Sequence, residues 1–238
     1  MPDPLFFDAY RRGNPPWDIG RAQPAFVELA QAGEIKGSVL DVGCGTGDLV
    51  LEMAERGHDA WGVDVVPMAI DQAKAKSQLR DVEACFLVGD ALELEHLNRT
   101  FDTVLDCGLF HIFSDPERIL YARQLAKVVA PGGVLHLMAM SDWEDPGWGG
   151  PRRISQAEIM EIFSSGWRFE DIREARFATT LQRVRGHAWL ATLVREAPKK
   201  SRKKAKTLPP QTEEHPAAKP AKASKAKAKR TEEHPHSR

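Results

Sequence analysis

Short apolar segments alternate with longer segments of helical character through most of the chain. The apolar segments are rich in valine, leucine and alanine, and they lack the alternating polar positions of a strand that faces water. They cover residues 38–42, 60–63, 84–88, 101–105 and 134–140. The helical segments cover residues 48–56, 68–80 and 117–130, the last one ended by the Pro-Gly-Gly sequence at 131–133. This alternation predicts a doubly wound α/β fold with a mostly parallel sheet.

The pattern changes near Gly166. Before it, Ser155 and Glu158 form a capping-box sequence that predicts the start of a helix. After it, residues 167–175 and 187–194 are both apolar enough to be strands, and only a turn-like segment separates them. We therefore expect a seven-stranded, Rossmann-like sheet that ends in an antiparallel hairpin.

Charge divides the chain at Pro198. The sequence holds 33 basic and 34 acidic residues; 13 of the basic and 4 of the acidic ones follow residue 197, which leaves 20 and 30 before it. The tail also lacks aromatic residues, and a segment with so little apolar surface cannot offset its ordering entropy. We predict one folded domain over residues 1–197 and a disordered, Lys/Ala/Pro-rich tail over 198–238. Such a tail suits non-specific contact with polyanions.

The cysteines and the hydropathy of the chain indicate its cellular compartment and whether a metal site is expected. Cys44, Cys85 and Cys107 show no C-x-x-C spacing and no neighbouring histidine cluster, so neither a disulfide framework nor a metal site is expected. No apolar run reaches the ~20 residues that span a bilayer, and the first residues contain no basic leader before an apolar stretch. These features predict a cytoplasmic protein without a membrane partner.

The most informative segment reads Val-Leu-Asp-Val-Gly-Cys-Gly-Thr-Gly over residues 39–47, where a buried strand runs into a glycine-rich turn. Gly43 and Gly45 allow a tight turn and the close approach of a ligand, because they have no Cβ atom. Asp41 lies two residues before the first glycine. Asp64 ends the next strand 19 positions after Gly45, about where an acid meets the hydroxyls of a ribose. An adenosine-containing ligand is therefore expected at this turn.

A third acid, Asp90, ends the third strand beside Ala91, where it is placed to accept a hydrogen bond from an adenine amino group. The carboxyl ends of parallel strands meet at one edge of the sheet, and α/β folds bind ligands there. Each acid taken alone is as consistent with the cap of a turn or a helix. The spacing of all three together favours a ligand site.

A nicotinamide dinucleotide is the main alternative ligand. Its fingerprint places the third glycine three positions after the second, whereas position 48 in this chain is Asp. An anion at the start of a helix opposes a pyrophosphate there. The pattern favours an adenosine without a pyrophosphate, carrying an ammonium group that Asp41 and backbone carbonyls can hold.

The motifs at 40–47, 62–64, 89–91 and 101–106 resemble, in order and spacing, those of class I S-adenosylmethionine-dependent methyltransferases. This resemblance covers roughly residues 38–140 and implies S-adenosylmethionine as the cofactor. Two further stretches, 14–24 and 109–111, are similar to the branch that contains thiol and thiopurine methyltransferases and bacterial methyltransferases of aromatic heterocycles and quinolones. That branch implies a small aromatic acceptor, methylated on a thiol, a hydroxyl or a ring nitrogen. The chain has fewer tryptophans around Trp17 than the plant thiol enzymes, which argues against a halide or a small thiol.

The same resemblance implies a role for each matching residue. It places Trp17 against the cofactor, Gly43 along the methionine moiety and Asp64 on the ribose. It also places Asp90 and Ala91 at the border of the adenine. Cys107 is implied to lie beside the cofactor, after the fourth strand.

The residues after the fourth strand are expected to face the acceptor. Methyl transfer from a sulfonium mainly needs alignment, because the methyl group is already activated. His111 is a candidate to remove a proton from the acceptor, and the alternative is a histidine at a helix start that is hydrogen-bonded to the backbone. Cys107 is expected to pack or to touch the cofactor rather than to act as a nucleophile, since no basic neighbour activates it. Residues 141–153 suit either a mobile lid or a plain surface loop.

Three functions remain open at this point. The leading one is methylation of a small aromatic molecule. The second is methylation of a nucleic acid or a protein that the basic tail holds, although the acidic body and the lack of an Asn-Pro-Pro-Tyr type of sequence after the fourth strand argue against a nucleic-acid base. The third is binding of S-adenosylmethionine without catalysis.

Overall fold

The computed structural model describes residues 4–13, 15–181 and 186–197, which all lie in the compact unit Met1–Lys199. Seven strands form one sheet in the order β3-β2-β1-β4-β5-β7-β6. The strands are β1 (Val39–Val42), β2 (Ala60–Asp64), β3 (Cys85–Val88), β4 (Phe101–Cys107), β5 (Val129–Met140), β6 (Trp167–Arg176) and β7 (His187–Arg195). β7 runs antiparallel to both of its neighbours, and the other neighbouring pairs are parallel. The predicted doubly wound sheet with a C-terminal antiparallel hairpin is confirmed.

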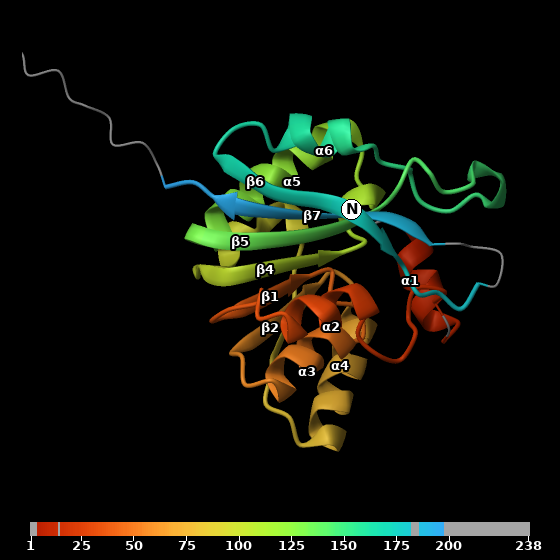
Figure 1. The fold of residues 1–238 in the computed structure, drawn as a ribbon. Helices are drawn as coiled ribbons and strands as arrows, with labels where there is room; N and C mark the ends of the chain where they lie inside the picture. The colour runs from red at the N-terminus through yellow and green to blue at the C-terminus, as the bar shows by residue number, and fades with distance from the viewer. Residues whose placement is uncertain (1–3, 14, 182–185, 198–238) are drawn as a thin grey trace, which may run out of the picture. The chain divides into compact units, whose positions relative to one another are not determined.

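Helices cover both faces of the sheet (Figure 1). One face carries α2 (Pro24–Gln31), α3 (Asp48–Glu55) and α4 (Pro67–Arg80), and the other carries α5 (Asp115–Val128) and α6 (Gln156–Ile162). The remaining helices are α1 (Pro4–Arg11) and the 3-10 turns η1 (Ala91–Leu97), η2 (Phe110–Ile112) and η3 (Pro146–Trp148). Figure 1 shows α1 near the edge of the sheet to which the arrowhead of β4 points. This is the edge that carries the glycine-rich turn.

The apolar pattern of the strands follows from this cover. All four residues of β1 are buried, and the two faces of the sheet contribute to two separate apolar clusters. Phe26 and Leu29 of α2 fill one cluster, and Tyr121 and Leu125 of α5 fill the other. Strands enclosed on both faces gain stability from apolar side chains on either side, so no polar alternation is selected.

One predicted boundary was wrong. Residues 131–133 do not separate a helix from a strand, because α5 ends at Val128 and β5 begins at the next residue. Phe101 pairs with Val129, whereas Thr103 pairs with Val134, so the residues between them bulge out of the ladder. Proline and glycine fit a bulge as well as a turn, and the sequence alone did not distinguish the two. The predicted tail lies outside the described residues.

Candidate functional site

The glycine-rich turn joins β1 to α3 with three residues in the left-handed region. Gly43, Gly45 and Gly47 have φ angles of 74°, 53° and 81°. A Cβ atom at Gly47 would lie 2.6 Å from the Phe86 ring and 2.7 Å from the Cβ atom of Ala73. The absence of a side chain at Gly47 thus allows α3 to pack close to β3 and α4. Gly43 and Gly45 form the part of the turn that follows β1.

The backbone amides of this turn are already used within the protein. The N–H groups of Gly43 and Cys44 donate to the carbonyl oxygen of Val63 at 2.8 and 3.0 Å. The N–H of Gly45 donates to Asp64 Oδ2 at 2.9 Å. A pyrophosphate site depends on free N–H groups that point at the ligand, and this turn offers none at these three residues. The geometry supports the exclusion of a dinucleotide.

One of the two reasons given above for that exclusion, the charge of Asp48 at the helix start, was wrong. Asp48 is buried, and its carboxylate lies 2.6 Å from Lys76 Nζ and 2.7 Å from a guanidinium nitrogen of Arg80. Two cations from α4 therefore balance its charge, and it does not repel an anion in front of the turn. The sequence alone gave no sign that α4 would bring these partners to Asp48.

Asp41 presents a buried carboxylate oxygen without a partner. Only 2% of the residue is exposed, and Oδ1 makes no hydrogen bond. Burial raises the pKa of Asp41 well above its usual range, and the charges of Asp106 and Asp64 add to this effect. An unpaired acid in such a place costs free energy unless a cation binds it. The site therefore fits the ammonium group of an amino-acid moiety.

Asp106 is a functional candidate that the sequence analysis did not single out, although it lies one residue before the end of β4. Its oxygens accept hydrogen bonds from the backbone N–H groups of Leu109, at 2.8 Å, and Phe110, at 3.1 Å. Burial raises its pKa to about 7. Three acids thus gather behind the glycine-rich turn, and together they favour a positively charged ligand.

The two other predicted acids are anchored to the backbone. Asp64 accepts from the N–H of Val66 at 2.9 Å as well as from the turn, and burial raises its pKa. Asp90 is exposed and accepts from the N–H of Leu92 at 2.8 Å, which caps η1, and Ala91 beside it is buried. The capping role considered above is thus real for Asp90. Each carboxylate still has lone pairs for a ribose or an adenine.

Trp17 lies over this end of the sheet together with Phe6 and Tyr10. Its indole N–H donates to the Tyr10 hydroxyl at 3.1 Å, and its ring centroid lies 5.6 Å from that of Phe6. The Tyr10 hydroxyl would lie 2.7 Å from a Cβ atom at Gly45, so Tyr10 rests directly on the turn. Trp17 itself is 39% exposed. Tyr10 was missed from the sequence, because its helix α1 precedes the recognisable motifs.

His111 and Phe177 form the wall next to the end of β4. The His111 and Phe177 rings meet edge-on, with centroids 5.8 Å apart, and a Cβ atom at Gly108 would touch both rings. His111 Nδ1 accepts the backbone N–H of Met140 at 3.0 Å, and burial lowers the pKa of His111 to about 3. These contacts match the backbone-bonded alternative stated above. Phe177 follows β6, and no motif marked it.

Cys107 is the last residue of β4, whereas the sequence analysis expected it just after that strand. Burial raises the pKa of its thiol well above the usual range, and the charges of Asp41 and Asp106 raise it further. A protonated thiol is a poor nucleophile. The geometry therefore supports a packing or contact role.

The loop over residues 141–153 is tied together from within. Arg153 donates to the carbonyl oxygens of Asp145, Gly149 and Pro151 at 2.5 to 2.7 Å. One guanidinium thus gathers three backbone groups of the loop. These bonds are compatible with either of the two roles considered above, a lid or a surface loop.

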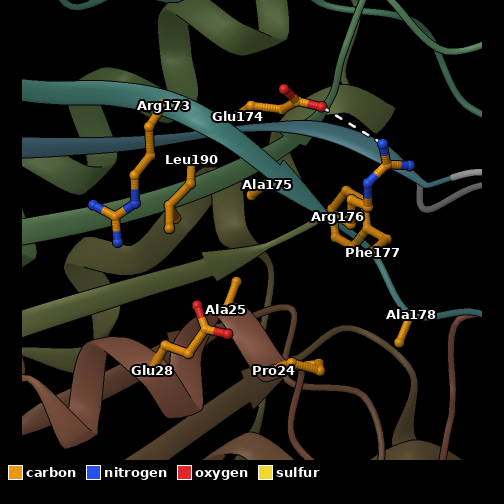
Figure 2. A pocket seen from close by; sticks show the side chains of 10 residues that line it. All are labelled: Pro24, Ala25, Glu28, Arg173, Glu174, Ala175, Arg176, Phe177, Ala178 and Leu190. Carbon is orange, nitrogen blue, oxygen red and sulfur yellow. Dashed lines mark ion pairs between the residues drawn. The ribbon is translucent and has the colours of Figure 1, made fainter.

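A groove of about 300 Å³ lies between α2 and the hairpin of β6 and β7, and Phe177 is one of the residues that line it (Figure 2). Figure 2 shows Glu28 on the α2 side of the groove, and Arg173, Ala175 and Leu190 on the side of the hairpin. None of the predicted cofactor residues lines this groove. Within the described residues no group of three or more His, Cys, Asp and Glu side chains could hold a metal ion, and no described helix is long and apolar enough to cross a membrane.

Comparison with known proteins agrees with this geometry. Residues 39–133 match the model of a methyltransferase domain. The chain is 35% identical over 164 residues to the 2-heptyl-1-hydroxyquinolin-4(1H)-one methyltransferase of Mycobacteroides abscessus, which covers 68% of this chain and 72% of that protein. It is 29% identical over 157 residues to a probable thiol methyltransferase of Arabidopsis thaliana, covering 65% of this chain and 69% of the relative.

Solved structures agree with this fold. A structure from work on the conversion of a disulfide bond into a thioacetal group during echinomycin biosynthesis is 35% identical, with a TM-score of 0.72 over 81% of this chain and 92% of that one. Magnesium protoporphyrin IX methyltransferase from Synechocystis with bound S-adenosylmethionine shares the fold, with 20% identity, 72% and 76% coverage and a TM-score of 0.57. The chain belongs to the class I S-adenosylmethionine-dependent methyltransferases. It is an enzyme of this class, and S-adenosylmethionine is its cofactor.

Proposed function

We propose that the enzyme transfers the methyl group of S-adenosylmethionine to a thiol, a hydroxyl or a ring nitrogen of a small aromatic acceptor. The observation that carries this proposal is the edge-on pair of His111 and Phe177 against Gly108, which places two aromatic rings at the end of β4, where an aromatic acceptor can pack against them. Relatives named for a hydroxyquinolone and for thiols support it, as does the relative from sulfur chemistry in echinomycin biosynthesis.

The acids at the strand ends and Trp17 would bind different parts of the cofactor. Asp41 would bind the ammonium group, Asp64 the ribose hydroxyls, and Asp90 with Ala91 the adenine. Gly43 and Gly45 let the backbone approach the methionine moiety. Trp17 would cover the cofactor, and Cys107 would touch it near the sulfonium. Bound S-adenosylmethionine supplies an activated methyl group.

His111 would position the acceptor rather than take its proton. Because Nδ1 accepts from Met140, the neutral ring carries its proton on Nε2, which makes that nitrogen a donor. A hydrogen-bond donor at this place would stabilise a methyl acceptor that is already ionised. The role of a base stays a prediction from the sequence, and it would require the Met140 bond to break.

Transfer from methyl-labelled S-adenosylmethionine to a panel of thiophenols, phenols and hydroxyquinolones tests the function. We expect product with at least one class, and the pH at which the rate rises should follow the pKa of the acceptor. A rise at one fixed pH for all acceptors would instead indicate a protein base. No transfer to any compound would contradict the proposal and favour a macromolecular acceptor or a non-catalytic binder.

The basic tail and the compartment belong to this proposal as well. We place the enzyme in the cytoplasm, where its three free cysteines, Cys44, Cys85 and Cys107, stay reduced. The excess of basic residues after Pro198 suits loose contact with polyanions. In this scheme the tail plays no part in holding the small acceptor.

A further inference from the structure

Two segments that are distant in the chain meet at the edge of the site. The first, residues 15–23, joins α1 to α2 and carries Trp17; we call it the cover segment. The second, residues 177–181, follows β6 and begins with Phe177, whose ring faces His111; we call it the wall segment. One segment thus borders the proposed cofactor position and the other borders the proposed acceptor position.

Gln23 fastens the two segments together. Its side-chain Nε2 donates to the carbonyl oxygen of Ala178 at 2.9 Å, and its Oε1 accepts the N–H of the same residue at 2.9 Å. Gln23 is only 7% exposed, so water competes little for these bonds. The backbone N–H of Thr180 also donates to the carbonyl oxygen of Pro16, at 3.2 Å. The bonds fix the register of one segment against the other.

The cover segment is also attached to the glycine-rich turn. Thr46 Oγ1 donates to Asp18 Oδ2 at 2.8 Å. Trp17 reaches the same turn through the Tyr10 hydroxyl, which rests on Gly45. The cover segment is therefore bonded to the cofactor turn on one side and to the wall segment on the other.

We propose that Gln23 is a positioning residue that transmits cofactor binding to the acceptor wall. A cofactor that orders the cover segment also orders the wall segment, because the bidentate bond to Ala178 joins the two backbones. The inference rests on the proposed place of the cofactor beneath Trp17. Coupling of this kind is reciprocal, so the bound cofactor tightens the acceptor site by the same factor by which the acceptor tightens the cofactor site.

Hydrogen exchange of the backbone amides of the wall segment tests this inference on the full chain, with and without S-adenosylhomocysteine. In the wild type we expect the ligand to slow exchange at Ala178 and Thr180 at least about fivefold, the lower end of usual coupling factors. Gln23→Ala should abolish this difference at Ala178 and reduce it at Thr180, whose N–H keeps its bond to Pro16. Gln23→Glu keeps the acceptor for the Ala178 amide but loses the donor, so it should give an intermediate effect. Gln31→Ala, at the exposed far end of helix α2, which Gln23 precedes, should behave like the wild type.

Calorimetric titration of S-adenosylhomocysteine, run in parallel, separates failure of the coupling from failure of the cofactor site. Ligand-dependent protection that is equal in the wild type and in Gln23→Ala, or is lacking in a wild type that binds the ligand, would overturn the inference. No binding to the wild type would overturn the cofactor placement and the inference together. If Gln23→Ala does not fold by circular dichroism, Gln23→Glu decides, and protection equal to the wild type overturns the inference.

Steady-state kinetics provide a second, independent measurement on the same variants. With an acceptor from the panel, Gln23→Ala should raise the acceptor KM roughly tenfold, the cost of two ordinary hydrogen bonds. The kcat should change less, since Gln23 touches none of the proposed reacting atoms. Equal loss in kcat with an unchanged KM would contradict the positioning role.

Discussion

At the scale of single residues, the site is built around acids that the fold keeps away from water. Asp41, Asp64 and Asp106 lie at or one residue before the ends of three neighbouring strands, and burial raises the pKa of each. Asp64 and Asp106 recover part of the cost by accepting backbone N–H groups, whereas Oδ1 of Asp41 has no donor. This arrangement destabilises the free protein locally, and a cationic ligand relieves it.

Asp41→Asn should therefore weaken the cofactor and strengthen the free fold. A raised pKa means that Asp41 takes up a proton as the pH falls toward its pKa, so wild-type affinity for S-adenosylmethionine should increase with rising pH and binding should release a proton. The variant should bind roughly 10- to 100-fold more weakly, with a flat pH dependence. Its ligand-free Tm at pH 8 should exceed that of the wild type. At this pH the buried carboxyl group of Asp41 lowers the stability of the wild-type fold, and the neutral Asn side chain does not.

Calorimetry in buffers of different ionisation enthalpy measures the proton, and thermal melting measures the fold. Asp71→Asn on the exposed surface of α4 is the matched control and should change neither quantity. Wild-type affinity that does not vary with pH, or an Asn variant with unaltered affinity, would remove Asp41 from the cofactor site.

At the scale of elements, the start of α3 packs closely against its neighbours. Gly47 has a φ of 81°, and a Cβ atom there would collide with Phe86 of β3 and Ala73 of α4. Gly57, at the other end of α3, has a φ of 88° but open space around it. The two glycines separate the cost of backbone strain from the cost of crowding.

Gly57→Ala should lower the free energy of unfolding by about 1 to 2 kcal/mol, the cost of the left-handed conformation. Gly47→Ala adds overpacking to this strain, so it should cost about 2 to 5 kcal/mol. Urea unfolding followed by circular dichroism measures both. Equal losses in the two variants would show that α3 can move away from β3 and that its close approach is not a fixed feature of the fold.

The elements of the central sheet were predictable because they bury both faces. Capping signals added correct helix starts, as at Ser155, where the hydroxyl accepts the Glu158 N–H at 3.2 Å. The predictions failed where long-range pairing overrode a local signal, as in the bulge at 131–133. In the site, the positions of the acids near the strand ends could be predicted from their spacing along the sequence. Phe177 and Gln23 were not, because a contact across 155 residues leaves no local pattern.

At the scale of the whole molecule, charge is separated along the chain. The 13 basic and 4 acidic residues after residue 197 offset most of the acidic excess of the first 197, which hold 20 basic and 30 acidic residues. All residues placed in the cofactor and acceptor sites belong to the acidic part. We therefore expect long-range attraction of a polyanion to depend on the tail, and the chemistry to depend on the rest of the chain.

Deletion of residues 198–238 should therefore leave turnover of a small acceptor within about twofold of the full chain. The same deletion should abolish retention on heparin at low salt, because the remaining chain carries a net charge of −10 from 20 basic and 30 acidic residues. Comparing both chains in methyl transfer and in salt elution from heparin measures the two effects separately. A loss of most small-acceptor activity on deletion would tie the tail to catalysis. It would then favour an acceptor large enough to touch the tail and the site together.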